Sequence, residues 1–291
     1  MSAGTRLDVA DFDVPGRGRG LLDVLQWRYL LRLLVRKGTA TRYRNSVLGW
    51  VWSYVKPASQ FLIYYFVMGI ILQFHRDVQN FAIYLFAGIV VVNLFNEAFG
   101  NATNAIVDNR ALVKKIYLPR ELFPIAAIIV AFVHFLPQLV ILLAVCLLVG
   151  WAPSVIGLIG VVLGILLVVA FSLGLGLFFS GLNVRFRDAQ NFVDLIKMFS
   201  TWTSPVLYTW ALVAEALRNH EWLFFLYMSN PITVAVEMFH AGFWQPTTDS
   251  AYALPDWFGY SALTAVAVTV LALVAGQLTF RRFERTFAQD L

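Results

Sequence analysis

The stretch Arg42–Pro57, RYRNSVLGWVWSYVKP, marks the point at which this chain enters a membrane. Arginines suit lipid phosphates, tryptophan and tyrosine suit the headgroup layer, and a proline interrupts the helical hydrogen-bond ladder soon after the membrane is entered. These residues are, in order, Arg42, Arg44, Trp50, Trp52, Tyr54 and Pro57. A basic, amphipathic arm precedes the stretch, and mostly apolar sequence follows it. The stretch therefore predicts the start of the first transmembrane helix.

The composition excludes a soluble domain. Hydrophobic residues make up 59% of the 291 positions, charged residues only 13%, and the mean hydropathy is +0.71. A domain whose surface faces water needs far more polar residues. The single cysteine, Cys146, rules out an internal disulfide. We therefore expect an all-α integral membrane protein.

The N-terminal arm predicts an amphipathic helix over residues 21–37. Arg28, Arg32 and Arg36 recur every four residues and form one basic stripe beside leucines. Such a helix lies in the membrane interface with its arginines on lipid phosphates, and contact with a cytoplasmic partner is a compatible alternative. We divide the chain into a cytoplasmic tail with this helix, residues 1–41, and a transmembrane domain, residues 42–291.

Six apolar stretches are long enough to cross a hydrocarbon core of ~30 Å, which takes ~20 helical residues. The predicted spans are residues 57–74, 78–95, 125–151, 154–184, 192–208 and 257–280, with the second ending near Glu97. The third and fourth are close enough in sequence to form a tight hairpin. The fourth carries small residues at helical spacing, which favour close packing within one subunit over a dimer seam. They are Gly157, Gly160, Gly164, Ser172, Gly176 and Ser180.

The basic residues predict the orientation. Nineteen of the 22 lysines and arginines fall in the N-terminal arm, the loops after the second and fourth spans, and the C-terminus. The positive-inside rule places these segments, and both termini, in the cytoplasm.

Between the fifth and sixth spans, the apolar runs 222–229 and 232–244 are each too short to span. We expect them to form external re-entrant or interfacial half-helices. If one of them spanned instead, the C-terminal arginines would lie outside.

Further motifs carry a family resemblance. The run Asn109–Arg120 with Pro124, the run Asn183–Asp188, Ser204–Pro205 with Tyr208, and Asn230–Pro231 follow the opening stretch in that order. Together they resemble the ABC-2 type permeases that export polysaccharides, the O-antigen and teichoic-acid exporters. Leu118 stands where the family often has Phe, and Phe186 replaces a Tyr.

This resemblance implies a homodimer of six-helix subunits in the bacterial inner membrane, joined to two copies of a nucleotide-binding ATPase. The expected cargo is a lipid-linked polysaccharide, with a cell-wall galactan or an O-antigen-like polymer as the nearest match. Membrane lipids are further partners, and nucleic acid is not expected. No glycine is followed by lysine, so the chain has no Walker A phosphate loop and no ATPase site of its own. It is a transporter subunit rather than an enzyme, and ATP and Mg would be bound by the partner.

The resemblance also assigns roles to the cytoplasmic loops. The loop after the second span would form a short coupling helix that meets the ATPase, through Asn109, Lys114, Lys115, Tyr117 and Arg120. Asp108 and Asn109 are residue types that cap helix starts. The alternative is that the lysines only set the orientation. The cytoplasmic mouth would be formed by Arg42, Arg44, Arg185, Arg187 and Asp188.

An aromatic stripe is the candidate substrate path. At ~100° per residue, one face of the first span carries Trp50, Tyr54, Phe61, Tyr64, Tyr65 and Met68. The fifth span offers a sparser face with Phe192, Phe199, Thr203 and Trp210. Sugar rings stack their C–H faces on aromatic rings, so a wall of such rings would let a polymer slide. Ordinary helix packing explains the stripe equally well.

Two other classes of transporter or enzyme stay open. An ABC-2 exporter of a drug or small lipid would share the topology. A membrane-embedded glycosyltransferase or an ion-coupled carrier would need intramembrane carboxylates, and only Glu97 and Asp194 lie in or near spans. Local pairing of Asp194 with Lys197, three residues later, is the favoured role. The four histidines are scattered, and their spacing does not predict a metal site.

Overall fold

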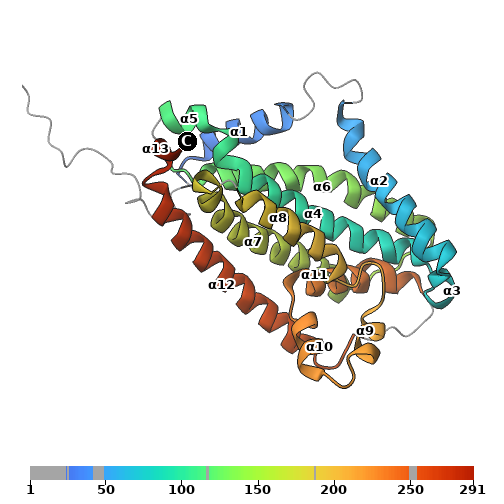
Figure 1. The fold of residues 1–291 in the computed structure, drawn as a ribbon. Helices are drawn as coiled ribbons and strands as arrows, with labels where there is room; N and C mark the ends of the chain where they lie inside the picture. Colours follow the sequence, from blue (N-terminus) through green and yellow to red (C-terminus); the bar gives the residue numbers. More distant parts are fainter. Residues whose placement is uncertain (1–23, 25, 42–48, 116–117, 187, 249–253) are drawn as a thin grey trace, which may run out of the picture.

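Four long helices form the body of the fold, with the last of them along its outer edge (Figure 1). They are α4 (Phe81–Asp108), α6 (Leu122–Leu148), α7 (Val155–Arg185) and α12 (Phe258–Glu284). The computed structural model describes residues 24, 26–41, 49–115, 118–186, 188–248 and 254–291, and every regular element in these ranges is a helix. Each long helix is apolar enough to cross a membrane, and a bent pair, residues 221–228 with 231–247, makes a fifth candidate. The membrane prediction is confirmed, and the six-span arrangement stays a prediction.

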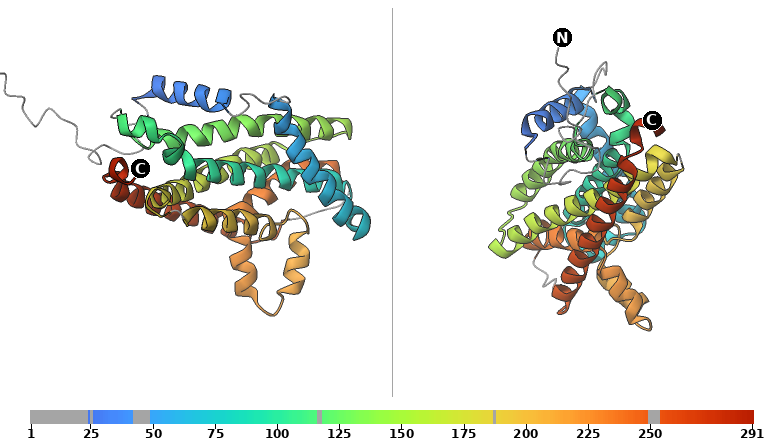
Figure 2. Two further views of the ribbon diagram at one scale, coloured as in Figure 1. Left: turned by 45° about the horizontal axis from the view of Figure 1, so that its top comes forward. Right: turned by 90° about the vertical axis from the view of Figure 1, so that its left-hand side faces the viewer.

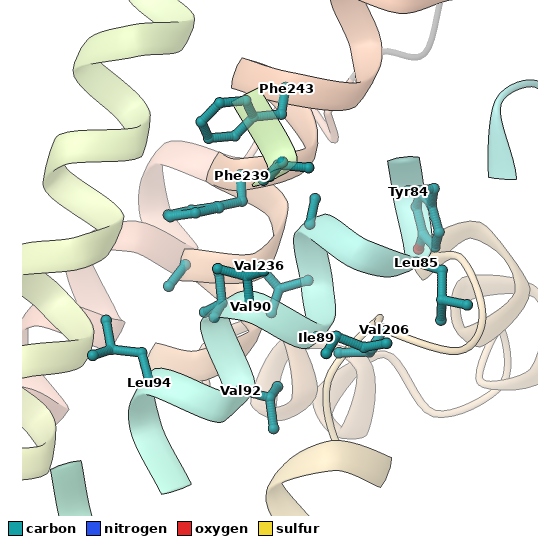
Figure 3. Close-up of a cluster of buried hydrophobic side chains, with 14 of the residues drawn as sticks. Tyr84, Leu85, Ile89, Val90, Val92, Leu94, Val206, Val236, Phe239 and Phe243 are labelled. Carbon is teal, nitrogen blue, oxygen red and sulfur yellow. The ribbon is translucent and has the colours of Figure 1, made fainter. Parts of the chain in front are cut away.

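Helix α4 is the central helix of the bundle. In its most apolar window 72% of the residues are buried, against 17–39% in the other three long helices. Its N-terminal half supplies a large part of the core, where Val90 lies beside Val236 on α11 (Pro231–Phe239) and Ile89 lies beside Val206 (Figure 3). A helix enclosed by protein in this way can carry polar groups that a lipid-facing helix cannot.

The predicted end of the second span near Glu97 is wrong, because α4 continues to Asp108. The residues after Glu97 alternate in type at helical spacing. Phe99, Ala102 and Ile106 stay fully buried, as does Thr103, whose hydroxyl donates to the Phe99 carbonyl, while Asn101 and Asn104 are only partly buried. An apolar face that continues in register keeps the helix packed even where its average hydropathy falls.

The first span is α2 (Trp52–Tyr64) continued by a π-helical turn, η4 (Tyr65–Ile71), and preceded by η3 (Gly49–Val51). It includes the turn before Pro57, as the sequence predicts, so that this proline lies inside the helix. A short helix, α3 (Phe74–Asp77), then leads into α4.

The fifth predicted span is helical only in part. Helix α8 (Ala189–Trp202) ends before Pro205, and residues 203–208 form turns, so the prediction of helix as far as Tyr208 is wrong. Proline cannot donate to the helical ladder. The Tyr84 hydroxyl lies 2.8 Å from the carbonyl oxygens of both Pro205 and Tyr208. This contact satisfies non-helical backbone inside the protein, as the interior of a membrane requires.

Three short helices follow α8. The predicted apolar runs form α10 (Glu221–Met228) and α11, which continues into the π-helical η5 (His240–Trp244) and η6 (Gln245–Thr247). The two arms meet at 70° at the predicted break, where the side chain of Asn230 caps the Ile232 amide at 3.1 Å. The sequence did not predict α9 (Trp210–Ala216), which projects from the body with α10 (Figure 2).

The small residues of α7 pack within the subunit, as predicted. A methyl group on Gly164 would lie 3.4 Å from the Ala235 carbonyl oxygen on α11, and one on Gly157 would lie 3.2 Å from the Ala241 oxygen. Ser172 and Ser180 are fully buried. Close backbone approach of this kind is what small residues allow between membrane helices.

The N-terminal arm contains α1 (Arg28–Thr41), which lies against α6. Arg28, Arg32 and Arg36 are exposed, while leucines on the other face pack onto the bundle. The amphipathic prediction is therefore confirmed for this part. Helix α1 shares one end of the molecule with α5 (Arg110–Lys115), α13 (Phe287–Asp290) and the C-terminus (Figure 1).

The distribution of basic residues predicts a labelling pattern in intact cells. A membrane-impermeant thiol reagent should reach Thr247→Cys and should not reach Gln289→Cys, because the positive-inside rule holds the C-terminus in the cytoplasm. The native Cys146 is fully buried and gives little background. Labelling of both positions from outside would contradict this orientation.

Candidate functional site: a polar cleft along α4

Polar side chains follow one face of α4. Residues 93, 97, 101 and 104 follow one another at intervals of three or four, with residue 96 beside them, which places them in a row along a helix. The row consists of Asn93, Asn96, Glu97, Asn101 and Asn104. Polar groups at membrane depth are costly and normally face protein or a water-filled cavity. A cavity is therefore expected along this row.

A cleft of about 550 Å³ lies beside the row. Its walls come from α2, α4, α6 and α8, and from α2 they include Trp52, Lys56 and Gln60. His134 and Gln138 on α6 and Lys197 on α8 complete the polar lining. The cleft therefore offers carboxamides, two ammonium groups, an imidazole and a carboxylate within an otherwise apolar bundle.

Part of this lining is tied into a hydrogen-bond network. Glu97 Oε1 lies 2.8 Å from His134 Nδ1, which joins α4 to α6. The Asn93 carboxamide donates to Gln138 at 3.3 Å, and the Ser200 hydroxyl donates to Asn96 at 3.0 Å. These contacts hold the walls in place. A buried polar network with satisfied partners stiffens the helices that share it.

Other polar groups of the cleft stay available. Within the described residues, the side chains of Lys56, Gln60 and Asn101 form no hydrogen bond or ion pair with protein. Lys197 pairs with Asp194 at 2.9 Å, as the sequence predicts, and its partner is exposed. A ligand in the cleft would meet donors that protein acceptors do not already occupy.

The aromatic stripe of the first span faces the core of the same subunit. Phe61, Tyr64, Tyr65 and Met68 pack against the buried cluster of α4. The Phe61 ring centre lies 5.7 Å from that of Tyr65 and 5.6 Å from that of Phe86 on α4. Tyr54 is 40% exposed, and the side chain of Trp50 lies outside the described residues. These contacts favour the packing alternative for the central part of the stripe, and its role as a substrate path stays a prediction.

The expected aromatic face of the fifth span is not continuous. Phe199 is exposed on α8, but Thr203 follows the end of that helix, and Trp210 begins α9. The Trp210 ring lies 6.5 Å from Phe224 on α10. The prediction of a single helical face through these residues is therefore wrong, because the turn at Pro205 separates Phe199 from Trp210.

The short helix predicted in the loop after the second span is present as α5, and its role in coupling stays a prediction. Val113 is buried and anchors it, while Lys114 and Lys115 are exposed. Asn109 does not use its side chain to begin this helix. Its oxygen accepts from Lys37 at 2.9 Å and its amide donates to the Ala105 carbonyl at 2.8 Å, which ties α4 to α1.

The other predicted cytoplasmic residues have different surroundings. Arg120 is buried, donates to the Glu284 carbonyl and lies over the Phe287 ring, so it braces the C-terminal helices from inside. Arg185 and Asp188 are exposed at the α7–α8 junction. Four predicted residues lie outside the described ranges: Arg42, Arg44, Tyr117 and Arg187.

Comparison with known proteins decides the family. Residues 29–244, well over half of the chain, match the ABC-2 type transporter family. The chain belongs to the ABC-2 type transporter family. It is also 27% identical to the O-antigen export system permease protein RfbA of Myxococcus xanthus over 271 residues, covering 92% of this chain and 98% of that protein.

Further relatives carry the same description. An RfbA permease of Klebsiella pneumoniae is 26% identical over 83% of this chain and 90% of its own length. A second one from that organism is 28% identical over 64% of this chain and 71% of its own length. This ABC-2 permease therefore aligns with O-antigen export permeases over most of their length.

The polar row of the ABC-2 permease was not predicted from the sequence. The predicted span ends near Glu97, although the asparagines before and after it keep helical spacing. The signal was a row of carboxamides with a period of three to four residues inside an apolar helix. That pattern predicts a helix enclosed by protein with one wet side.

Proposed function

We propose that this ABC-2 permease moves a lipid-linked polysaccharide of the O-antigen or cell-wall galactan type across the inner membrane. Two permease subunits and two copies of a separate ATPase form the working complex, with ATP and Mg bound by the ATPase. Both termini lie in the cytoplasm.

The polar cleft along α4 carries this proposal. Sugars present many hydroxyl groups, and carboxamides can both donate to them and accept from them. A row of such groups offers successive, individually weak sites, so a polymer can advance without being held at one of them. The available carboxamides of Gln60 and Asn101 suit this role, as does the likeness to permeases described as O-antigen exporters.

The ion-coupled carrier is less well supported. Its carboxylates would have to exchange a cation during transport. Glu97 and Asp194 instead hold protein partners at 2.8 Å and 2.9 Å. An exporter of a small drug would be served by an apolar pocket, since such ligands bury mostly apolar surface. The cleft beside α4 is lined by amides and charges, and the apolar cavity next to it, about 170 Å³, is smaller than the ~300 Å³ or more of a pocket for a drug-sized ligand.

Deletion of the gene tests the proposal in cells. The surface polysaccharide should disappear, and its lipid-linked form should accumulate on the cytoplasmic side, because synthesis continues without export. Gel analysis of surface glycan and extraction of lipid-linked polymer measure the two pools. A plasmid copy of the gene should restore both. Normal surface glycan in the deletion strain would refute the proposal, and altered drug sensitivity alone would favour the small-molecule alternative.

A further inference from the structure

A second cavity adjoins the polar cleft, and it too is walled by α2, α4 and α6. It has a volume of about 170 Å³. Its walls are almost wholly apolar, with Ala58 and Phe61 from α2, Ile83 and Phe86 from α4, and Leu142 from α6. We call it the apolar groove.

The two cavities share a wall. Pro57 and Gln138 line both the polar cleft and the apolar groove. A ligand with one polar end and one apolar end would therefore find both environments side by side. Among biological ligands, this combination is typical of lipids.

The charges of the cleft favour an anionic head group. Lys56 lies four residues into α2, about 6 Å along the helix from its first residue, so it stays near headgroup level. Its ammonium has no ion pair or hydrogen bond with a described residue. A lysine placed there attracts phosphate groups.

Lys197 supplies a second positive charge to the same cleft. A side chain on Gly100 would meet its Nζ at 3.3 Å, so the glycine leaves room for the lysine to lie against α4. Its ion pair with Asp194 is exposed, and exposed pairs contribute little stability. A phosphate group could therefore replace the carboxylate at little cost.

The size of the groove limits how much of the ligand's apolar end it can hold. An apolar cavity of ~150 Å³ holds one benzene molecule, so the groove admits a short segment of a single chain. A phospholipid with two acyl chains does not fit both of them there. The free carboxamides of Gln60 and Asn101 would face whatever is attached beyond the phosphate, and they suit a sugar.

We propose that the cleft and the groove together bind the lipid end of the transported substrate, with its phosphate between Lys56 and Lys197 and a short segment of its single hydrocarbon chain in the apolar groove. This inference rests on the proposed function and assigns the lipid-binding site to it. The lipid is defined by its chemistry, a phosphate group on one chain.

Binding to the purified complex of permease and ATPase, in nanodiscs of zwitterionic lipid, tests this site. The probe is a fluorescent single-chain alkyl phosphate. Lys56→Gln with Lys197→Gln should weaken its binding about tenfold or more, because two charge-assisted contacts are lost. Ala58→Trp, which fills the groove, should weaken it to a similar extent. Arg218→Gln and Leu278→Trp make the same changes at a remote cation and on the exposed face of α12, and should leave binding unchanged.

Competition separates the possible sources of phosphate. Inorganic phosphate should compete poorly, because it lacks the chain, and phosphatidylglycerol should compete poorly, because it carries two. Equal binding by the parent and the lysine variant would overturn the proposal, as would strong competition by either compound or an intact affinity in Ala58→Trp. These measurements concern binding alone, so the proposed lipid site can be refuted while the deletion strain still loses surface glycan. Normal surface glycan in that strain would instead refute the proposed function.

Discussion

Replacing Lys114 and Lys115 together by glutamate is expected to abolish coupling between the permease and its ATPase. Both side chains are exposed on α5, whereas Val113 on the same helix is buried and fixes its position. The substitution therefore changes the charge presented to a partner without altering the packing of the bundle. At roughly 1.5 kcal/mol for each charge pair lost at the interface, association should weaken by about a hundredfold. Copurification of the ATPase with the permease measures this loss.

Two controls separate partner contact from membrane orientation. Lys114→Arg with Lys115→Arg keeps both charges and should retain the ATPase. Labelling at Thr247→Cys should be unchanged in the glutamate variant if the chain still inserts correctly. The coupling role would be refuted if the glutamate variant inserts normally, retains its ATPase and exports glycan at the parental rate.

The general plan of the molecule could be predicted from the sequence because it depends on local patterns. The length of the apolar stretches predicted the long helices α6, α7 and α12 to within a few residues. The arginine stripe predicted α1, and Asn230–Pro231 predicted the break between α10 and α11. Each of these features is decided by a few neighbouring residues.

The remaining features depend on contacts between distant residues. The turn after α8 is held by Tyr84, more than a hundred positions away, and hydropathy does not report such a contact. Asn93 and Asn96 are tolerated because α6 and α8 provide partners for them. The inward position of Arg120 likewise depends on the C-terminal helices.

The aromatic stripe shows the limit of helical periodicity as a guide to function. The pattern correctly grouped Phe61, Tyr64 and Tyr65 on one face of the first span, and these residues do pack on one side. Periodicity does not reveal whether that face meets a substrate or another helix of the same subunit. The contacts with Phe81 and Phe86 show that this face packs against α4 of the same subunit.

The polar cleft leads to the second large expected effect. Gln60→Leu combined with Asn101→Leu removes two carboxamides that have no protein partner among the described residues, so the network around Glu97 and His134 stays intact. If each makes one hydrogen bond of about 1 kcal/mol to the moving glycan, export should slow by about thirtyfold. Gln26→Leu makes the same chemical change at an exposed position of the N-terminal arm and should have no effect.

Transport by the reconstituted complex tests the central claim most directly. Vesicles carry permease and ATPase with the cytoplasmic face outward, lipid-linked polysaccharide is added outside, and protection of the glycan from external glycosidase is followed after ATP is supplied. The account predicts ATP-dependent protection with the parent chain and with Gln26→Leu, and a rate about thirtyfold lower with the Gln60→Leu/Asn101→Leu variant. A glycan that stays fully accessible with the parent chain, or a double variant that protects it at the parental rate, would contradict the claim that a polysaccharide passes along this cleft.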